Sequence, residues 1–352
     1  MTGNDPDKPK DLSERFSCNF IKKYGEGGYG ATFAATSKDT GEELAVKIMD
    51  MRKVRPDAIK KECQILEVLK HPNVIGVRGH GAGYGGKHLH LYFIFMELAA
   101  GGELFDQVCK RGPDAMPEQH ARVFFCQMLD GLNYCHLAGV AHRDLKLENV
   151  LLTSEGVVKL IDFGLSHVYP VDRSTGVTIV DRSTPLRDVC GSKSYAAPDV
   201  LAAQGYDGFA ADIWSLGVCL FAMLSGFFPL DEASVNDWRF TKLQDAQRAG
   251  HSTVASIYGF YKRTAKHLSS TVINLLDHLL QIDPSQRITM AQVREHPWVT
   301  GKPTEPKDQG SYTTHDIVDD EGPVYRGMGA LPSTFDGEEI PLDDEDSQPI
   351  CE

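Results

Sequence analysis

The hydrophobic pattern of the chain changes near Gly101, and this change constrains the fold more than any other feature. Before that point, short apolar runs separated by Gly, Asp and Thr predict β-strands, with one helical run at Pro56–Lys70. From Gly101 to Val299 the apolar residues recur at helical spacing. We therefore expect an α+β fold with a small β-rich part and a larger helical part. The strand candidates are Phe20–Thr36, Glu43–Met49 and His90–Leu98, and the clearest amphipathic helices are Ala121–Gly139 and Thr271–Gln281.

Acidic charge is concentrated near the C-terminal end of the sequence. The 352 residues carry a formal net charge of −13, and from Gly301 onward 14 Asp and Glu face only 3 Lys and Arg. The first 300 residues are therefore close to neutral, which argues against a nucleic-acid or membrane surface. We expect residues 1–18 to form a polar leader and residues 300–352 to form an acidic, disordered tail.

Cysteine spacing and apolar runs indicate the cellular compartment of the protein. The eight cysteines are dispersed without a C-x-x-C pair, which is typical of reduced thiols, and the first residues lack a secretory pattern. The longest apolar run, Ile213–Leu230, is interrupted by Gly and Ser, so we interpret it as a buried helix that ends at Gly226. These features predict an intracellular protein of the cytoplasm, the nucleus or both.

A glycine-rich stretch, GEGGYG, occupies Gly25–Gly30. Backbone N–H groups that no side chain obstructs can bind phosphate oxygens. The same spacing occurs in dinucleotide-binding folds, where it connects a strand to a helix. Here the residues from Thr32 onward predict a strand and a hairpin, so we favour a loop that covers phosphates between two strands. An ordinary flexible hairpin is the alternative at this point.

A lysine lies inside the apolar run that follows. Lys47 belongs to LAVK, and a buried ammonium requires an anionic partner. Phosphate oxygens are one such partner, and Glu62 is another because it shares a helix face with Leu66 and Leu69. Glu67 lies on another face of the same helix and is the poorer candidate.

Two further motifs supply groups suited to phosphoryl transfer. HRDLKLEN spans His142–Asn149, and DFG begins at Asp162. Asp144 is a carboxylate that can accept a hydroxyl proton, and Lys146 can hold the transferred phosphoryl group. Asn149 and Asp162 offer oxygen ligands for Mg²⁺. This chemistry depends on positioning and charge neutralisation, which these residue types provide.

With these motifs in this order, the chain from about Phe20 to Val299 resembles a eukaryotic protein kinase. The resemblance implies a bilobal fold, with an N-lobe over residues 19–98 and a C-lobe over residues 99–299, and it implies ATP and Mg²⁺ as cofactors. It assigns catalytic roles to Lys47, Glu62, Asp144 and Lys146, magnesium binding to Asn149 and Asp162, and nucleotide binding to Gly25, Glu26, Gly27, Gly28, Tyr29, Gly30, Lys47, Met96, Glu97 and Ala99. It assigns structural roles to Asp199, Arg287 and Asp212.

Finer features indicate a subgroup and a substrate class. Lys146, two residues after Asp144, is similar to serine/threonine kinases, and GGELFD, CGS and HPW resemble the calcium/calmodulin-dependent group. IKKE, AMPE, FFCQ and NDW are similar to checkpoint effector kinases. Glu103 and Glu148 match positions that bind an arginine three residues before the target hydroxyl. Ala222 replaces the acid that selects a second arginine. The expected partners are protein substrates, with no nucleic acid, no membrane and no calmodulin site, and the chain is expected to be a monomer.

Asp188 lies two residues before CGS, where many similar kinases carry a threonine that is phosphorylated. An aspartate offers less charge than a phosphate but can still pair with Arg143 of HRD. We therefore expect Asp188 to supply a permanent activating contact; a solvated loop aspartate is the alternative. Three residues depart from the family pattern: Thr32, Leu147 and Asp199, and the shorter Asp199 is expected to loosen its ion pair with Arg287.

Other interpretations remain open from the sequence. They are a catalytically inactive scaffold, an NAD-binding oxidoreductase and a nucleic-acid module built on IYGFYKR (Ile257–Arg263), whose aromatic residues are more typical of packing. The pentapeptide VDRST occurs at 171–175 and again at 180–184, and we interpret it as a local insertion in a loop.

Overall fold

The computed structural model describes residues 11–27, 30–111, 115–174 and 178–301. The chain divides into two compact units. The first contains the residues up to Gly102 together with Leu151–Gly164, and the second contains Glu103–Val150 and the chain from Leu165 onward. The predicted lobe boundary at residues 98 and 99 differs from this division, because Leu151–Gly164 packs with the first unit. Leu160 N–H donates to Asn73 O, and Ile75 N–H donates to Leu160 O.

The first unit is built on a five-stranded antiparallel sheet with the strand order β1-β2-β3-β5-β4. One face buries Val46, Phe95 and Phe16, whose ring stacks on Phe95 at 4.1 Å. Helix α2 packs on the other face through Ile59 and Cys63. The elements of this unit are α1 (Leu12–Arg15), β1 (Phe16–Gly27), β2 (Gly30–Ser37), β3 (Glu43–Asp50), α2 (Pro56–Val68), β4 (Val77–Tyr84), β5 (Lys87–Glu97) and β9 (Val158–Leu160), while β6 (Gly102–Glu103) and β8 (Val150–Leu152) lie where the chain changes unit.

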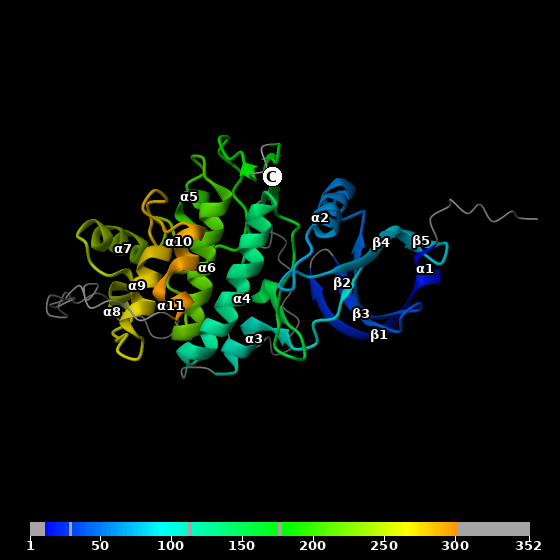
Figure 1. The fold of residues 1–352 in the computed structure, drawn as a ribbon, viewed down its shortest axis with the longest axis horizontal. Coiled ribbons are helices and arrows are strands. Elements are labelled where there is room, and N and C mark those ends of the chain that lie inside the picture. The colour runs from blue at the N-terminus through cyan, green and yellow to red at the C-terminus, as the bar shows by residue number, and fades with distance from the viewer. Residues whose placement is uncertain (1–10, 28–29, 112–114, 175–177, 302–352) are drawn as a thin grey trace, which may run out of the picture. The chain divides into compact units, whose positions relative to one another are not determined.

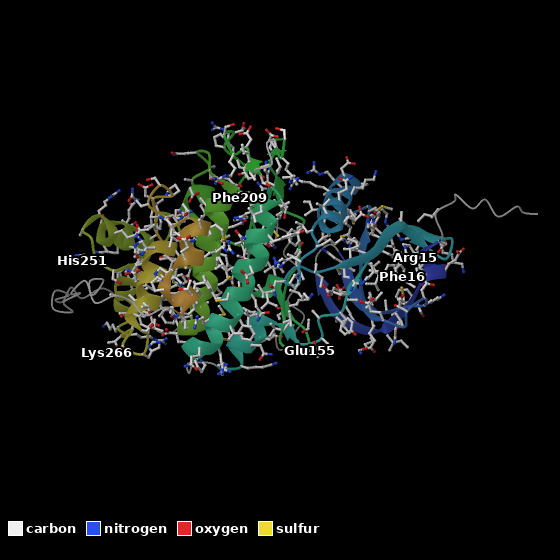
Figure 2. The ribbon with its side chains drawn as sticks, in the orientation of Figure 1. Arg15, Phe16, Glu155, Phe209, His251 and Lys266 are labelled. Atoms are coloured by element: carbon white, nitrogen blue, oxygen red, sulfur yellow. The ribbon has the colours of Figure 1, made fainter. Side chains whose placement is uncertain are left out.

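The predicted polar leader, residues 1–18, overlaps this unit. Residues 1–10 lie outside the described residues, but α1 begins at Leu12 and β1 at Phe16, which is only 2% exposed. Figure 2 labels Arg15 and Phe16 at the point where α1 passes into β1. The leader is therefore shorter than predicted, because one buried aromatic ring makes Phe16 part of the core.

The second unit is helical and is organised around α6 (Gly208–Ser225), which packs against α4 (Glu118–Leu137) and α9 (Ser270–Leu279) (Figure 1). By length and apolar composition α6 could cross a membrane, but 89% of it is buried inside the protein. It ends at Gly226, which adopts φ 71° as the C-cap, as predicted for this run. The other helices are α3 (Leu104–Cys109), α5 (Pro198–Leu201), α7 (Trp238–Arg248), α8 (Thr253–Phe260), α10 (Met290–Glu295), α11 (Pro297–Thr300) and the short helix η2 (Leu147–Asn149).

Short strand pairs complete this unit. Strand β7 (Val140–Ala141) pairs with β10 (His167–Val168), and β11 (Val171–Asp172) pairs with β12 (Ile179–Val180). The first residues of the two copies of VDRST therefore belong to paired strands, where the sequence predicted only a loop insertion. The predicted tail begins within α11, and its residues 302–352 lie outside the described residues. Ile257 and Tyr258 of IYGFYKR are buried core residues of α8.

Candidate active site

In the first unit, Lys47 lies between two carboxylates. Its Nζ is 3.0 Å from Glu62 Oε1 and 3.7 Å from Asp162 Oδ1. Burial alone would lower the pKa of Lys47, but the charges of Glu62 and Asp162 outweigh that effect and raise the pKa. Lys47 is therefore held as an ammonium ion beside the first residue of DFG.

Strand alternation and helix periodicity explain why Lys47 and Glu62 come into contact. Lys47 is opposite Thr32 on β2 and Ile94 on β5, and it shares with Met49 the sheet face that α2 covers. On α2, Glu62 faces the sheet and is 6% exposed. The less favoured Glu67 contacts His80 instead, with 2.9 Å between Oε1 and Nε2. The expected Lys47–Glu62 pair is thus present.

The glycine stretch lies between two strands. Gly25, Glu26 and Gly27 end β1 and Gly30 begins β2, while Gly28 and Tyr29 lie outside the described residues. A Cβ on Gly30 would lie 2.0 Å from Ile48 O, so glycine is required there. A strand follows this stretch, where a dinucleotide-binding fold requires a helix.

The residues expected to contact adenine lie at the end of β5. Met96 is opposite Ala45 on β3 and Val77 on β4. Glu97 is the last residue of β5, and its side chain accepts hydrogen bonds from Lys159 and from Gly76 N–H. Ala99 follows β5 and is partly exposed.

In the second unit, Asp144 is 9% exposed and surrounded by donors. Its Oδ2 accepts a hydrogen bond from Asn149 Nδ2 at 3.0 Å and lies 3.1 Å from Lys146 Nζ. Its Oδ1 accepts bonds from the backbone N–H of Ser192 at 2.9 Å and from the Ser192 hydroxyl at 3.1 Å. Lys146 also donates to Ser192 Oγ at 2.8 Å. The carboxylate is therefore fixed in position, and Ser192 is a contact that sequence reasoning missed.

Asp212, on α6, anchors the segment that carries Asp144. It is fully buried and accepts hydrogen bonds from the backbone N–H groups of His142 and Arg143, each at 2.8 Å. His136 Nε2 approaches Asp212 Oδ2 at 2.8 Å. These bonds hold Arg143 at φ 66°, which a residue with a side chain adopts only when its surroundings enforce it. The sequence indicated the structural role of Asp212 but not its contact with His136.

Arg143 connects this segment to the activation segment, residues 162–201. Its Nη1 is 2.7 Å from Asp188 Oδ2, and its Nε donates to Leu165 O at 2.7 Å. Tyr206 accepts a hydrogen bond from Arg143 and donates to Asp188 O. Burial raises the pKa of Asp188, but the hydrogen bond and charge of Arg143 outweigh burial and lower it. The expected Asp188–Arg143 pair is present.

The predicted substrate-recognition acids lie near each other in the second unit. Burial, with the neighbouring charges of Asp106 and Glu148, raises the pKa of Glu103. Glu148 accepts a hydrogen bond from the Tyr195 hydroxyl at 2.9 Å. Asp106 is an acid that sequence reasoning did not single out. This arrangement favours a cation beside Glu103.

Asp199 and Arg287 form their predicted ion pair, at 2.8 Å. Among the described residues, the second carboxylate oxygen of Asp199 is buried without a hydrogen-bond partner. The shorter side chain therefore retains the pair and leaves one oxygen unsatisfied.

The expected magnesium ligands are chemically suitable. Asp162 offers a carboxylate, and Asn149 uses its amide nitrogen on Asp144, which leaves the amide oxygen as the possible ligand. Within the described ranges, no group of three or more His, Cys, Asp or Glu side chains could hold a metal ion on its own. Magnesium commonly takes one or two protein oxygens together with substrate phosphates and water, so each of these side chains suits it without a complete protein cage.

Comparison with known proteins places the chain in a family. The protein kinase domain matches residues 18–299, so the chain belongs to the protein kinase family, and the predicted β-rich N-lobe and helical C-lobe are confirmed. CBL-interacting serine/threonine-protein kinase 8 of Arabidopsis thaliana is 36% identical over 278 residues, which are 78% of this chain and 55% of that protein. CBL-interacting protein kinase 9 of Oryza sativa subsp. japonica is 34% identical over 304 residues, 85% of this chain and 60% of that protein. The chain thus matches only a little over half the length of these curated relatives.

Proposed function

We propose that the chain is a serine/threonine protein kinase that transfers the γ-phosphate of ATP to hydroxyl groups of proteins. The observation that carries the proposal is the fixed carboxylate of Asp144, held by Asn149 and Ser192 and lying 3.1 Å from Lys146. The match to the protein kinase domain and the similarity to a serine/threonine-protein kinase of Arabidopsis thaliana support it. A glycine stretch followed by a strand argues against the NAD-binding alternative.

The residues supply distinct parts of the reaction. Asp144 accepts the proton of the attacking substrate hydroxyl. The hydroxyl oxygen bonds to the γ-phosphorus as the bond between that phosphorus and the ADP oxygen breaks. Lys146 offsets negative charge on the transferred group, and Lys47, oriented by Glu62, contacts the remaining phosphates. Asp162 and Asn149 each offer an oxygen that would hold magnesium, which would supply neutralisation of phosphate charge.

A direct experiment tests this proposal against the inactive-scaffold alternative. Purified full-length chain is incubated with labelled ATP, Mg²⁺ and a basic peptide containing serine. We expect phosphate transfer, reduced by about 10²- to 10⁴-fold in Asp144→Asn. Asp130→Asn, an exposed acid on α4, is the control. No transfer by the unaltered chain, or equal transfer by Asp144→Asn, contradicts the proposal.

We further propose that Asp188 orders the activation segment without phosphorylation. Its 2.7 Å contact with Arg143 supports this. We also propose that Glu103 and Glu148 bind an arginine three residues before the target hydroxyl. If so, the enzyme lacks its preferred site within its own sequence, because no arginine in the chain is followed three residues later by serine or threonine.

The subgroup and cellular setting are further proposals. The motifs GGELFD, CGS and HPW support the calcium/calmodulin-dependent group, whereas the similar kinases of Arabidopsis thaliana and Oryza sativa are CBL-interacting kinases and do not single out checkpoint effector kinases. The free cysteines of the described residues support a reducing, intracellular setting.

A further inference from the structure

The duplicated VDRST pentapeptides lie in the activation segment, and their first residues pair with each other. Val171, the first residue of one copy, is opposite Val180, the first residue of the other. In each copy the aspartate accepts a hydrogen bond from the backbone N–H of the serine two residues later, at 2.8 Å for Asp172 and 3.0 Å for Asp181. The copies therefore share sequence and local turn geometry.

Their arginines have different surroundings. Arg182 forms an ion pair with Asp207, and its guanidinium lies 5.1 Å from the centre of the Phe209 ring. Asp207 is already fixed, because its Oδ1 caps α6 by accepting a hydrogen bond from Phe209 N–H at 2.9 Å. Arg173 is exposed, and no hydrogen bond or ion pair of its side chain is found among the described residues. Among the described residues, the second copy is therefore attached to the start of α6 through its arginine, and the first copy is not.

Tyr169, which precedes β11, contacts the start of α6, and Val171, the first residue of β11, contacts Gly139, which follows α4. Tyr169 accepts a hydrogen bond from Gly208 N–H at 2.9 Å, and its ring meets Phe209 edge to face at 5.2 Å. Val171 packs closely on Gly139, which adopts φ 83°. A Cβ on Gly139 would lie 2.4 Å from Val171 Cγ2. Figure 2 labels Phe209, the second residue of α6.

From Phe209 the contacts continue to the catalytic segment. The Phe209 ring stacks on His136 at 4.0 Å, and His136 contacts Asp212 at 2.8 Å. Asp212 in turn holds the backbone of His142 and Arg143. The attachment of Arg182 is therefore two side chains away from the carboxylate that positions the Asp144 segment.

We propose that Arg182 is a second tether of the activation segment, in addition to Asp188, and a positioning residue for phosphoryl transfer. The inference rests on the proposed kinase function. An exposed ion pair alone contributes little, but here one guanidinium makes both an ion pair and a cation–π contact, and its acceptor is already held by the helix cap. The two tethers flank Pro185–Arg187, so together they order the segment before CGS.

The experiment compares Arg182→Ala with Arg173→Ala, which makes the same change in the same pentapeptide. Amide hydrogen exchange over residues 179–190 is measured alongside kcat and KM for a peptide substrate. In Arg182→Ala we expect exchange about 5- to 10-fold faster and kcat several-fold lower, with KM for ATP unchanged. Arg182→Lys should recover most of the loss. Asp207→Asn retains a capping residue at the start of α6 and should reproduce the effects of Arg182→Ala. The double variant Arg182→Ala/Asp207→Asn should show little further change in exchange or kcat.

The outcomes separate the two proposals. If the unaltered chain transfers no phosphate, the proposed function is wrong, and the exchange measurement alone decides the tether. If Arg182→Ala matches Arg173→Ala in exchange, the tether is overturned. If exchange rises while kcat stays at the level of the unaltered chain, the positioning role is overturned.

Discussion

Lys159 donates hydrogen bonds to both carboxylate oxygens of Glu97, each at 2.9 Å. Lys159 is on β9, three residues before Asp162, and Glu97 is the last residue of β5. The Lys159 side chain is 10% exposed. Glu97 also accepts a hydrogen bond from Gly76 N–H at 2.7 Å. One ion pair thus joins the strand leading to DFG, the residues expected to contact adenine and the connection between α2 and β4.

Removing one partner of this pair should destabilise the first unit. In Lys159→Met the Glu97 carboxylate loses its counter-charge, and we expect the free energy of unfolding to fall by about 3–5 kcal/mol. Chemical denaturation measures the change. Arg52→Met removes an exposed ion pair with Asp50 in the same unit and should change little. Adding Glu97→Gln to Lys159→Met should recover part of the loss, and failure to do so would contradict the electrostatic explanation.

Asp188→Ala should lower kcat/KM of the unphosphorylated enzyme about 5- to 10-fold, because Arg143 loses a charge-assisted hydrogen bond. Asp188→Glu should retain most activity, and Arg187→Ala, an exposed neighbour, serves as the control. Equal activity of Asp188→Ala and the unaltered enzyme would show that the contact does not order the segment.

The pH dependence of the same contact has a definite sign. Because the folded pKa of Asp188 is lowered below 3.8, its contribution is fully present above the unfolded pKa and is lost as pH falls through the folded pKa. A phosphothreonine, whose second pKa is about 6, would instead change charge near pH 6. The measurement is amide exchange over residues 179–190, corrected for intrinsic exchange rates. We expect no step in the corrected rate between pH 5.5 and 7, which is roughly the range in which a phosphate would titrate. A step that Asp188→Ala abolishes would contradict this assignment.

Glu103→Gln should reduce the preference for arginine three residues before the target. Loss of a charge-assisted hydrogen bond of about 1.5–3 kcal/mol corresponds to about 10-fold or more in kcat/KM for the arginine peptide. The value for the matching alanine peptide should stay unchanged, and Asp130→Asn should affect neither. The folded pKa of Glu103 is raised, so Glu103 becomes protonated at a higher pH than an ordinary glutamate does. As pH is lowered, the preference for arginine should therefore weaken earlier than it would with an ordinary glutamate. A uniform loss with both peptides would refute the specificity role.

Asp277 on α9 should make the second unit less stable as pH rises. Burial raises its pKa to about 6, although Val254 N–H and the Ser252 hydroxyl donate to its Oδ1. The folded form therefore binds a proton that the unfolded form has released, so stability falls between about pH 4 and 6 and the penalty remains above that. Asp277→Asn should stabilise the protein by about 1–2 kcal/mol at neutral pH, and less at pH near 5. Denaturation at both pH values, with the exposed Asp245→Asn as control, measures the difference.

Residues close in sequence or set by periodicity could be predicted well. The apolar run around Lys47 and the helical spacing of Glu62 with Leu66 and Leu69 predicted that Lys47 and Glu62 could pair, and a glycine after an apolar run predicted the end of α6. The motif order predicted the family, which the protein kinase match confirms. Catalytic roles of individual residues stay predictions that the proposed variants test.

Other features depended on residues far apart along the chain. The Ser192 bonds to Asp144, the Lys159 bonds to Glu97 and the docking of Arg182 on Phe209 have no local signature, because the partners meet only when separate elements pack. Identical VDRST copies illustrate the limit: both arginines are exposed, but Arg182 contacts Asp207 and Phe209, whereas no hydrogen bond or ion pair of Arg173 is found among the described residues. Local pattern by itself indicated the β-rich and helical parts and the motifs that identify the family. Tertiary packing decided which charges meet, since burial and distance to a partner are properties of the folded chain.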